Sequence, residues 1–160
     1  MKVALFIKKV KPMEKLDYII NPILMGGLVK EINEDMVKVH LHGRLGVITI
    51  PEKIILSEIE LEPGVELEFH FSYLKVEDAG YDYDDSSIRD NLFTPCLVGG
   101  QIVEVNDTAV KVETMDDLGT VAVPRRWVFT DMPLECGQMV EFYLSPMRAV
   151  GKRDIPARII

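Results

Sequence analysis

Cysteine is scarce in this chain of 160 residues, and its two cysteines do not form a recognisable pair. Cys96 and Cys136 lack the C-x-x-C spacing of a redox site. They also fall at unmatched positions of the internal repeat described below, whereas a disulfide framework keeps its cysteines in register with such a repeat. We therefore expect two reduced thiols rather than a disulfide-stabilised fold.

The motifs of common catalytic and cofactor sites are also missing. The sequence contains no P-loop and no G-x-G-x-x-G segment for phosphates. No serine or cysteine stands in a nucleophile signature. Pairs of carboxylates are uninformative in so acidic a chain, whose formal net charge is −8. We therefore expect a protein that is not an enzyme and that holds no cofactor.

Long apolar runs are absent as well. The N-terminal run at residues 3–7 is far shorter than a membrane span. It is also too short for the core of a signal peptide, and lysines follow it. We therefore expect no membrane segment and a cytoplasmic location, with residues 3–7 forming a strand or a packing arm.

The sequence does contain an internal repeat. Residues 26–75 align with residues 99–148 without a gap at an offset of 73, and 16 of the 50 aligned positions are identical. A repeat of this kind constrains the architecture, because each copy is one structural unit. We call these two segments the first copy and the second copy.

Each copy has the pattern of several short β-strands. In the first copy Val37, Val39 and Leu41 alternate with polar residues, which is the period of a half-buried strand. Gly46 begins the next strand and Pro51 ends it, since proline cannot donate to a β ladder. Short strands with glycine turns are typical of a closed barrel. The sequence therefore predicts an all-β protein of two tandem small five-stranded barrels, OB-like or SH3-like.

Composition and charge suggest the boundaries of the parts. Both ends of the chain are basic, whereas the two copies and the segment between them are acidic. We predict an N-terminal arm, a first barrel, an acidic linker, a second barrel and a C-terminal tail, at residues 1–19, 20–76, 77–92, 93–150 and 151–160.

The order of features in each copy carries a family resemblance. The first copy contains Gly27-x-Val29-x-x-Ile32, then Val37-x-Val39, Gly46-Val47-Ile48 and Leu61-Glu62-Pro63-Gly64-x-x-Leu67. The second copy has matching segments at 100–105, 110–112, 119–121 and 134–140. This order resembles the RNA-binding OB repeat of ribosomal and exonuclease proteins, and the resemblance implies a small barrel that binds RNA. The copies are also similar to a group of small uncharacterised β proteins from anaerobic bacteria, which implies no activity.

The chain departs from the OB pattern at the positions that would bind RNA. RNA-binding barrels present aromatic side chains on their second and third strands for base stacking. The corresponding stretches at 36–39 and 109–112 contain none, and Pro51 and Pro124 stand where the family has histidine. The resemblance therefore supports the fold more than the ligand.

One cluster could still contact nucleic acid. Arg125, Arg126 and Trp127 combine two cations with a large aromatic, and Lys111 and Arg148 could extend this patch. Arginine forks bind phosphate and an indole stacks on a base. The alternative, which we favour, places Trp127 in the core, because large aromatics usually fill small barrels.

The histidines form a second candidate site. His40 and His42 point the same way on one strand, and His70 lies on the outward side of another. Three imidazoles could form an open zinc site. The alternative is three unrelated exposed histidines, which we favour because no ligand-spacing motif is present.

Three functions are open on the sequence alone. We favour a non-enzymatic binding module that docks a protein partner or associates with itself, because the chain has a repeat and no catalytic set. The first alternative is RNA or single-stranded nucleic-acid binding through an OB-like face, which the negative net charge disfavours. The second is small-molecule or metal sensing in a groove between the copies, since ligands often lie at domain interfaces.

Overall fold

The computed structural model describes residues 20–77 and 93–152. The predicted arm at 1–19 lies outside the described residues. So do all but one residue of the predicted linker at 77–92 and most of the predicted tail at 151–160. The structure therefore concerns the two copies and the residues beside them.

Strands occur in the same order in both halves. The first half contains β2 (Ile23–Asn33), β3 (Met36–Leu41), β4 (Val47–Pro51), β5 (Ile55–Leu56), β6 (Val65–Phe71) and β7 (Leu74–Glu77). The second half contains β8 (Cys96–Val105), β9 (Ala109–Thr114), β10 (Thr120–Pro124), β11 (Val128–Phe129), β12 (Met139–Leu144) and β13 (Met147–Lys152). Short 3₁₀ helices join some of them, namely η1 (Glu52–Ile54), η2 (Met115–Asp117) and η3 (Arg125–Trp127). The prediction of an all-β protein is confirmed.

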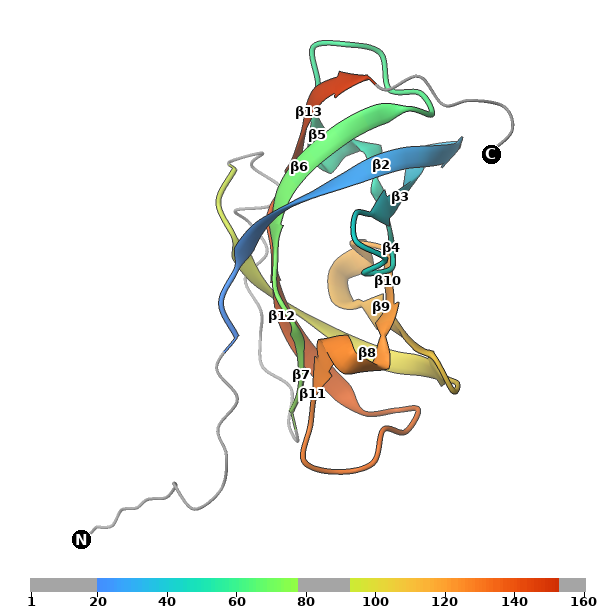
Figure 1. Cartoon of the computed structure of the whole chain (residues 1–160), viewed down its shortest axis with the longest axis vertical. Helices are drawn as coiled ribbons and strands as arrows, with labels where there is room; N and C mark the ends of the chain where they lie inside the picture. The colour runs from blue at the N-terminus through green and yellow to red at the C-terminus, as the bar shows by residue number, and fades with distance from the viewer. Residues whose placement is uncertain (1–19, 78–92, 153–160) are drawn as a thin grey trace, which may run out of the picture.

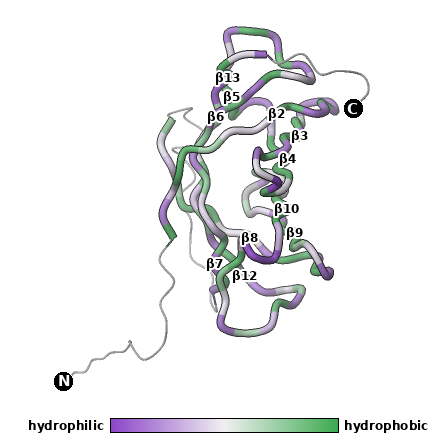
Figure 2. The backbone as a smooth tube through the Cα atoms, viewed as in Figure 1, coloured by the Kyte–Doolittle hydropathy of each residue, from purple (hydrophilic) through white to green (hydrophobic). Residues whose placement is uncertain are grey.

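Alternation along the strands produces one buried and one outer face. In β3, Val37, Val39 and Leu41 are buried, whereas Lys38 is exposed. Figure 2 shows hydrophobic and hydrophilic stretches alternating along the tube in both halves of the molecule. Strand β4 ends at Pro51, as predicted. Within the two described ranges, no helix has the length and apolar character to span a membrane.

The twelve strands form one sheet. Their order is β11-β7-β12-β8-β9-β10-β4-β3-β2-β6-β13-β5, and an additional pairing of β12 with β6 partly closes the ring. Strand β4 pairs with β10 where the two halves meet (Figure 1). The prediction of two separate barrels is therefore not confirmed, because the strands of the two halves belong to one hydrogen-bonded sheet.

The last strand of each half lies in the other half. Strand β7 pairs with β11 and β12, and β13 pairs in the same way with β5 and β6. Figure 1 shows this by colour, with red β13 beside β5 and β6 and green β7 beside β11 and β12. The two halves therefore exchange their last strands.

The short connections before the exchanged strands explain why the chain does not turn back. Only Ser72-Tyr73 separates β6 from β7, and only Ser145-Pro146 separates β12 from β13. A two-residue hairpin requires left-handed backbone, usually from asparagine or glycine. Proline fixes φ near −65°, and neither connection contains a residue with positive φ. The chain therefore continues into the neighbouring half.

Two buried serines form hydrogen bonds between the halves at the connections that precede the exchanged strands. The Ser72 hydroxyl accepts a hydrogen bond from the Tyr143 backbone N–H at 2.8 Å, and the Ser145 hydroxyl accepts one from the His70 N–H at 2.8 Å. Both serines are fully buried. Because Ser72 and Ser145 are equivalent and identical in the two copies, each half supplies one hydroxyl to the backbone of the other.

Pairings between the halves join equivalent positions. Ile48 faces Val121, and Phe71 faces Leu144. Each pair is separated by the repeat offset of 73 residues. An antiparallel pairing of equivalent positions has local two-fold symmetry, so the β4–β10 and β6–β12 contacts are both approximate two-fold junctions.

Candidate binding site

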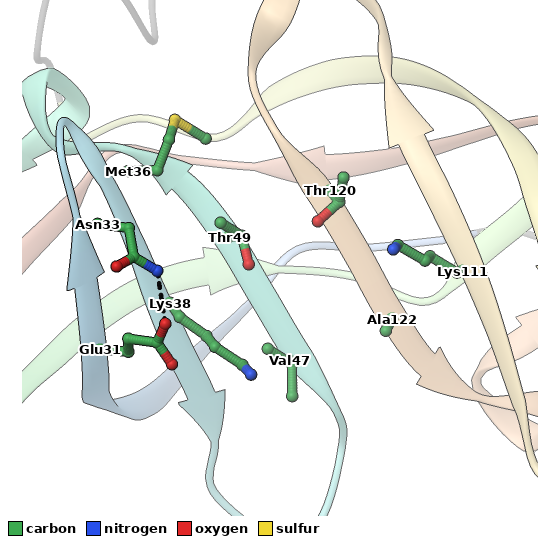
Figure 3. Close-up of a pocket in the computed structure, with 9 residues that line it drawn as sticks. All are labelled: Glu31, Asn33, Met36, Lys38, Val47, Thr49, Lys111, Thr120 and Ala122. Carbon is green, nitrogen blue, oxygen red and sulfur yellow. Dashed lines mark hydrogen bonds between the residues drawn. The ribbon is translucent and has the colours of Figure 1, made fainter.

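A groove crosses the outer face of the sheet at the β4–β10 junction (Figure 3). Its volume is about 400 Å³. The residues that line it come from both halves: Glu31, Asn33, Met36, Lys38, Val47, Thr49, Lys111, Thr120 and Ala122. The groove therefore exists only where the two halves are joined.

Four small residues form the floor of the groove. Thr49 faces Thr120 across the junction, and Val47 faces Ala122. These side chains point outward because Ile48 and the residues in register with it occupy the core face. In Figure 3 the hydroxyl groups of Thr49 and Thr120 point toward one another. The floor therefore has a polar row beside an apolar row.

Two lysines flank the floor from opposite sides. Lys38 on β3 is in register with Thr49, and Lys111 on β9 is in register with Ala122. They are equivalent and identical in the two copies. Figure 3 shows both ammonium groups directed toward the floor. Neither lysine forms a salt bridge within residues 20–77 and 93–152.

A carboxylate residue lies beside each lysine in the sheet, because Glu31 is in register with Lys38 and Glu104 is in register with Lys111. The Asn33 amide donates a hydrogen bond to the Glu31 carboxylate, drawn as a dashed line in Figure 3. His40 lies beside Lys38 on the outer face of β3. Burial, and then the charges of Lys30 and Lys38, lower the pKa of His40 below its ordinary value of 6.5. The lowered pKa favours the neutral form of His40 at pH 7, and the lysines carry the positive charge of the groove.

Glycines allow the two backbones to meet beneath this floor. Gly46 and Gly119 have φ angles of 115° and 104°. A Cβ atom added to Gly46 would lie 1.9 Å from the carbonyl oxygen of Ala122, and one added to Gly119 would lie 1.8 Å from that of Thr49. No side chain fits at either position, so the junction depends on both glycines.

The residues expected to contact nucleic acid lie in separate parts of the structure. Arg125 and Arg126 are exposed on η3, and the Arg125 guanidinium donates to the Asn106 carbonyl oxygen at 2.8 Å. Lys111 lies in the groove. Arg148 lies on β13, in the sheet of the first half, where it forms a salt bridge with Glu68 at 2.6 Å.

Trp127 lies in the core, which is the interpretation that the sequence favoured. It is 6% exposed, and its ring stacks on Tyr73 with centroids 3.8 Å apart. The Phe71 ring also stacks with the indole, with ring centroids 6.2 Å apart. The indole N–H donates to the Ser72 carbonyl oxygen at 2.9 Å. The indole therefore braces the connection between β6 and β7 and does not present a face to a base.

The histidines are not brought together. In the part of the chain that the structure describes, no three His, Cys, Asp or Glu side chains are grouped to hold a metal ion. His40 lies near the groove, and the His42 ring covers Gly26. His70 packs against Phe93 with ring centroids 4.8 Å apart. The three residues therefore occupy different surroundings on the outer face.

The sequence raised a groove between the copies as one alternative, but it did not identify the residues that line this groove. Its floor depends on β4 pairing with β10, which no periodicity encodes. One signal was available, because Lys38 and Lys111 are identical in the two copies although they lie on the exposed side of their strands. A comparison of the chain with protein-family models and with curated proteins finds no match.

Proposed function

We propose that the protein is a non-enzymatic binding module and that its ligand lies in the groove at the β4–β10 junction. The observation that carries this proposal is that residues of both halves line one concave site of about 400 Å³. That size is in the range of small-molecule sites, which often lie at interfaces between structural units.

A groove-filling variant tests this proposal. Ala122→Leu adds bulk to the floor, whereas Ala109→Leu makes the same change on neighbouring β9 outside the lining residues. We would screen a metabolite library against the ¹⁵N-labelled protein. Binding should shift the amides of Thr49 and Thr120, and only Ala122→Leu should abolish it. Ligands that bind both variants equally would refute the groove as the site.

A second candidate is docking of a protein partner on the outer face of the first half. Leu24, Ile59 and Val150 are 53%, 46% and 56% exposed. Two hollows that share Val150 connect them, and Glu66 and Glu68 line one of these hollows. The exposed apolar side chains favour a partner segment that has apolar side chains.

A displayed peptide library would test the second candidate. Peptides that contain several apolar residues should be enriched, and Val150→Asp should abolish their binding. Val103→Asp is the matched control, since Val103 is 43% exposed on β8 in the other half. RNA binding through Arg125 and Arg126 stays a third proposal, for which a salt-dependent RNA complex weakened by Arg126→Ala would be the supporting result.

A further inference from the structure

We infer that the groove binds a small amphipathic anion, with its oxyanion between Lys38 and Lys111 and its apolar body on Val47 and Ala122. This inference rests on the proposed function, because it names the ligand class for the same site. The oxyanion is a carboxylate or a phosphate, which share the chemistry that the groove recognises.

Donors converge on the centre of the groove. Two ammonium groups approach from opposite walls, and the hydroxyls of Thr49 and Thr120 lie on the floor to one side of the space between them (Figure 3). Strands β3 and β9 are three strand spacings apart, roughly 14 Å. The lysine side chains extend inward over this span, so one oxyanion can lie within reach of both. Charge-assisted hydrogen bonds of this kind are stronger than neutral ones.

The other half of the floor is apolar. Val47 and Ala122 face each other beside the threonine pair. A ligand anchored by its anion can therefore lay a short hydrocarbon body over these side chains. The described lining residues include no aromatic ring, so a nucleobase would find no stacking partner there.

The acids near the groove do not neutralise both lysines. Glu31 is in register with Lys38 and accepts a hydrogen bond from the Asn33 amide, and Glu104 is in register with Lys111. Glu113 is in register with Thr120 and Gln101, at the edge of the floor opposite Lys38. No ion pair of Lys38 or Lys111 is found in the described ranges. Both ammonium groups are therefore available to an incoming anion, although the whole chain is acidic.

Four matched probes test the inference on the full-length protein. Hexyl phosphate and hexanoate have both parts of the proposed ligand, hexanol lacks the anion, and inorganic phosphate lacks the apolar body. Amide shifts of Thr49 and Thr120 would report binding in the groove. We expect at least one of the two amphipathic anions to bind at least tenfold more tightly than hexanol and inorganic phosphate. Tighter binding of hexyl phosphate identifies a phosphate, and tighter binding of hexanoate identifies a carboxylate. Equal binding of the two supports an oxyanion site that accepts either group.

Lysine variants supply the second arm. Lys38→Gln and Lys111→Gln should each lower the affinity of the protein for the preferred anion by about tenfold. Lys53 is an exposed lysine outside the groove, and Lys53→Gln should leave this affinity unchanged. Hexanol that binds the groove as tightly as both anions would overturn the inference and leave the proposed function standing. Absence of shifts at the floor with all four probes would overturn the inference. The proposed function fails separately, if no metabolite in the library depends on the groove.

Discussion

At the β4–β10 junction, replacing one glycine by alanine should lower the free energy of unfolding strongly. Gly119→Ala places a Cβ atom 1.8 Å from the Thr49 carbonyl oxygen. Ordinary contacts of this kind are nearly twice as long, so β4 and β10 must move apart. The matched control is Gly137→Ala, because Gly137 has a similar φ of 96° and no atom within 4 Å of the added Cβ.

The magnitudes follow from separating backbone strain from the clash. Left-handed backbone at a non-glycine residue costs about 1–2 kcal/mol, and both variants incur this cost. Overpacking adds about 1–3 kcal/mol, and weakened hydrogen bonds between β4 and β10 add about 1 kcal/mol each. We therefore expect Gly119→Ala to lower the free energy of unfolding by about 2–3 kcal/mol more than Gly137→Ala does.

Urea denaturation followed by Trp127 fluorescence measures this difference, since the buried indole reports loss of the core. Gly46→Ala makes the equivalent change on the other side of the junction and should behave like Gly119→Ala. The double variant should destabilise by less than the sum, because both changes separate the same two strands. Equal destabilisation by Gly119→Ala and Gly137→Ala would refute the close approach of β4 and β10.

Three further predictions concern other contacts. Ser145→Ala leaves the buried His70 N–H without its side-chain acceptor and should lower the free energy of unfolding by about 1–3 kcal/mol in urea titrations. Because the folded pKa of His40 is lowered, the unfolded chain binds that proton first as the pH falls from about 6.5. Stability should therefore decrease on acidification, less steeply in His40→Gln, when urea midpoints are compared at pH 7.5 and 5.5. Cleavage at a protease site introduced between residues 78 and 92 should leave the halves associated in size-exclusion chromatography.

Local sequence patterns predicted the strands, but they did not predict which strands of the two halves pair with each other. The alternation of Val37, Val39 and Leu41 indicated β3, because burial of one sheet face leaves a period of two in the sequence. The partner of a strand leaves no such period. The Ser145-Pro146 connection was a usable signal, since it cannot form a tight hairpin, and it indicates that the last strand leaves its own half.

The candidate site was harder to predict for the same reason. Each copy alone contributes one lysine and two small outward residues, which are unremarkable on a strand. Only the antiparallel pairing of β4 with β10 brings Lys38 and Lys111 to opposite walls of one groove. The sequence analysis named Lys111 only as an extension of the cluster at Arg125, Arg126 and Trp127, and it favoured a core position for Trp127.

The cleavage experiment examines strand exchange most directly. Leu74 on β7 and Met147 on β13 are both fully buried in the opposite half, and full burial of such a side chain is worth about 1.5–3 kcal/mol. In the intact chain, Leu74→Ala should only lower stability, by about 2–5 kcal/mol, because the connecting residues keep the halves together.

After cleavage the same substitution should separate the halves, since the tether no longer holds them at high effective concentration. The cleaved chain without the substitution is the control and should elute as one species that binds the groove ligand. If the control instead separates into two folded halves that each retain Trp127 or Phe69 in a compact core, the exchanged strands do not hold the molecule together. The groove would then be lost with the separation, because its two walls belong to different halves.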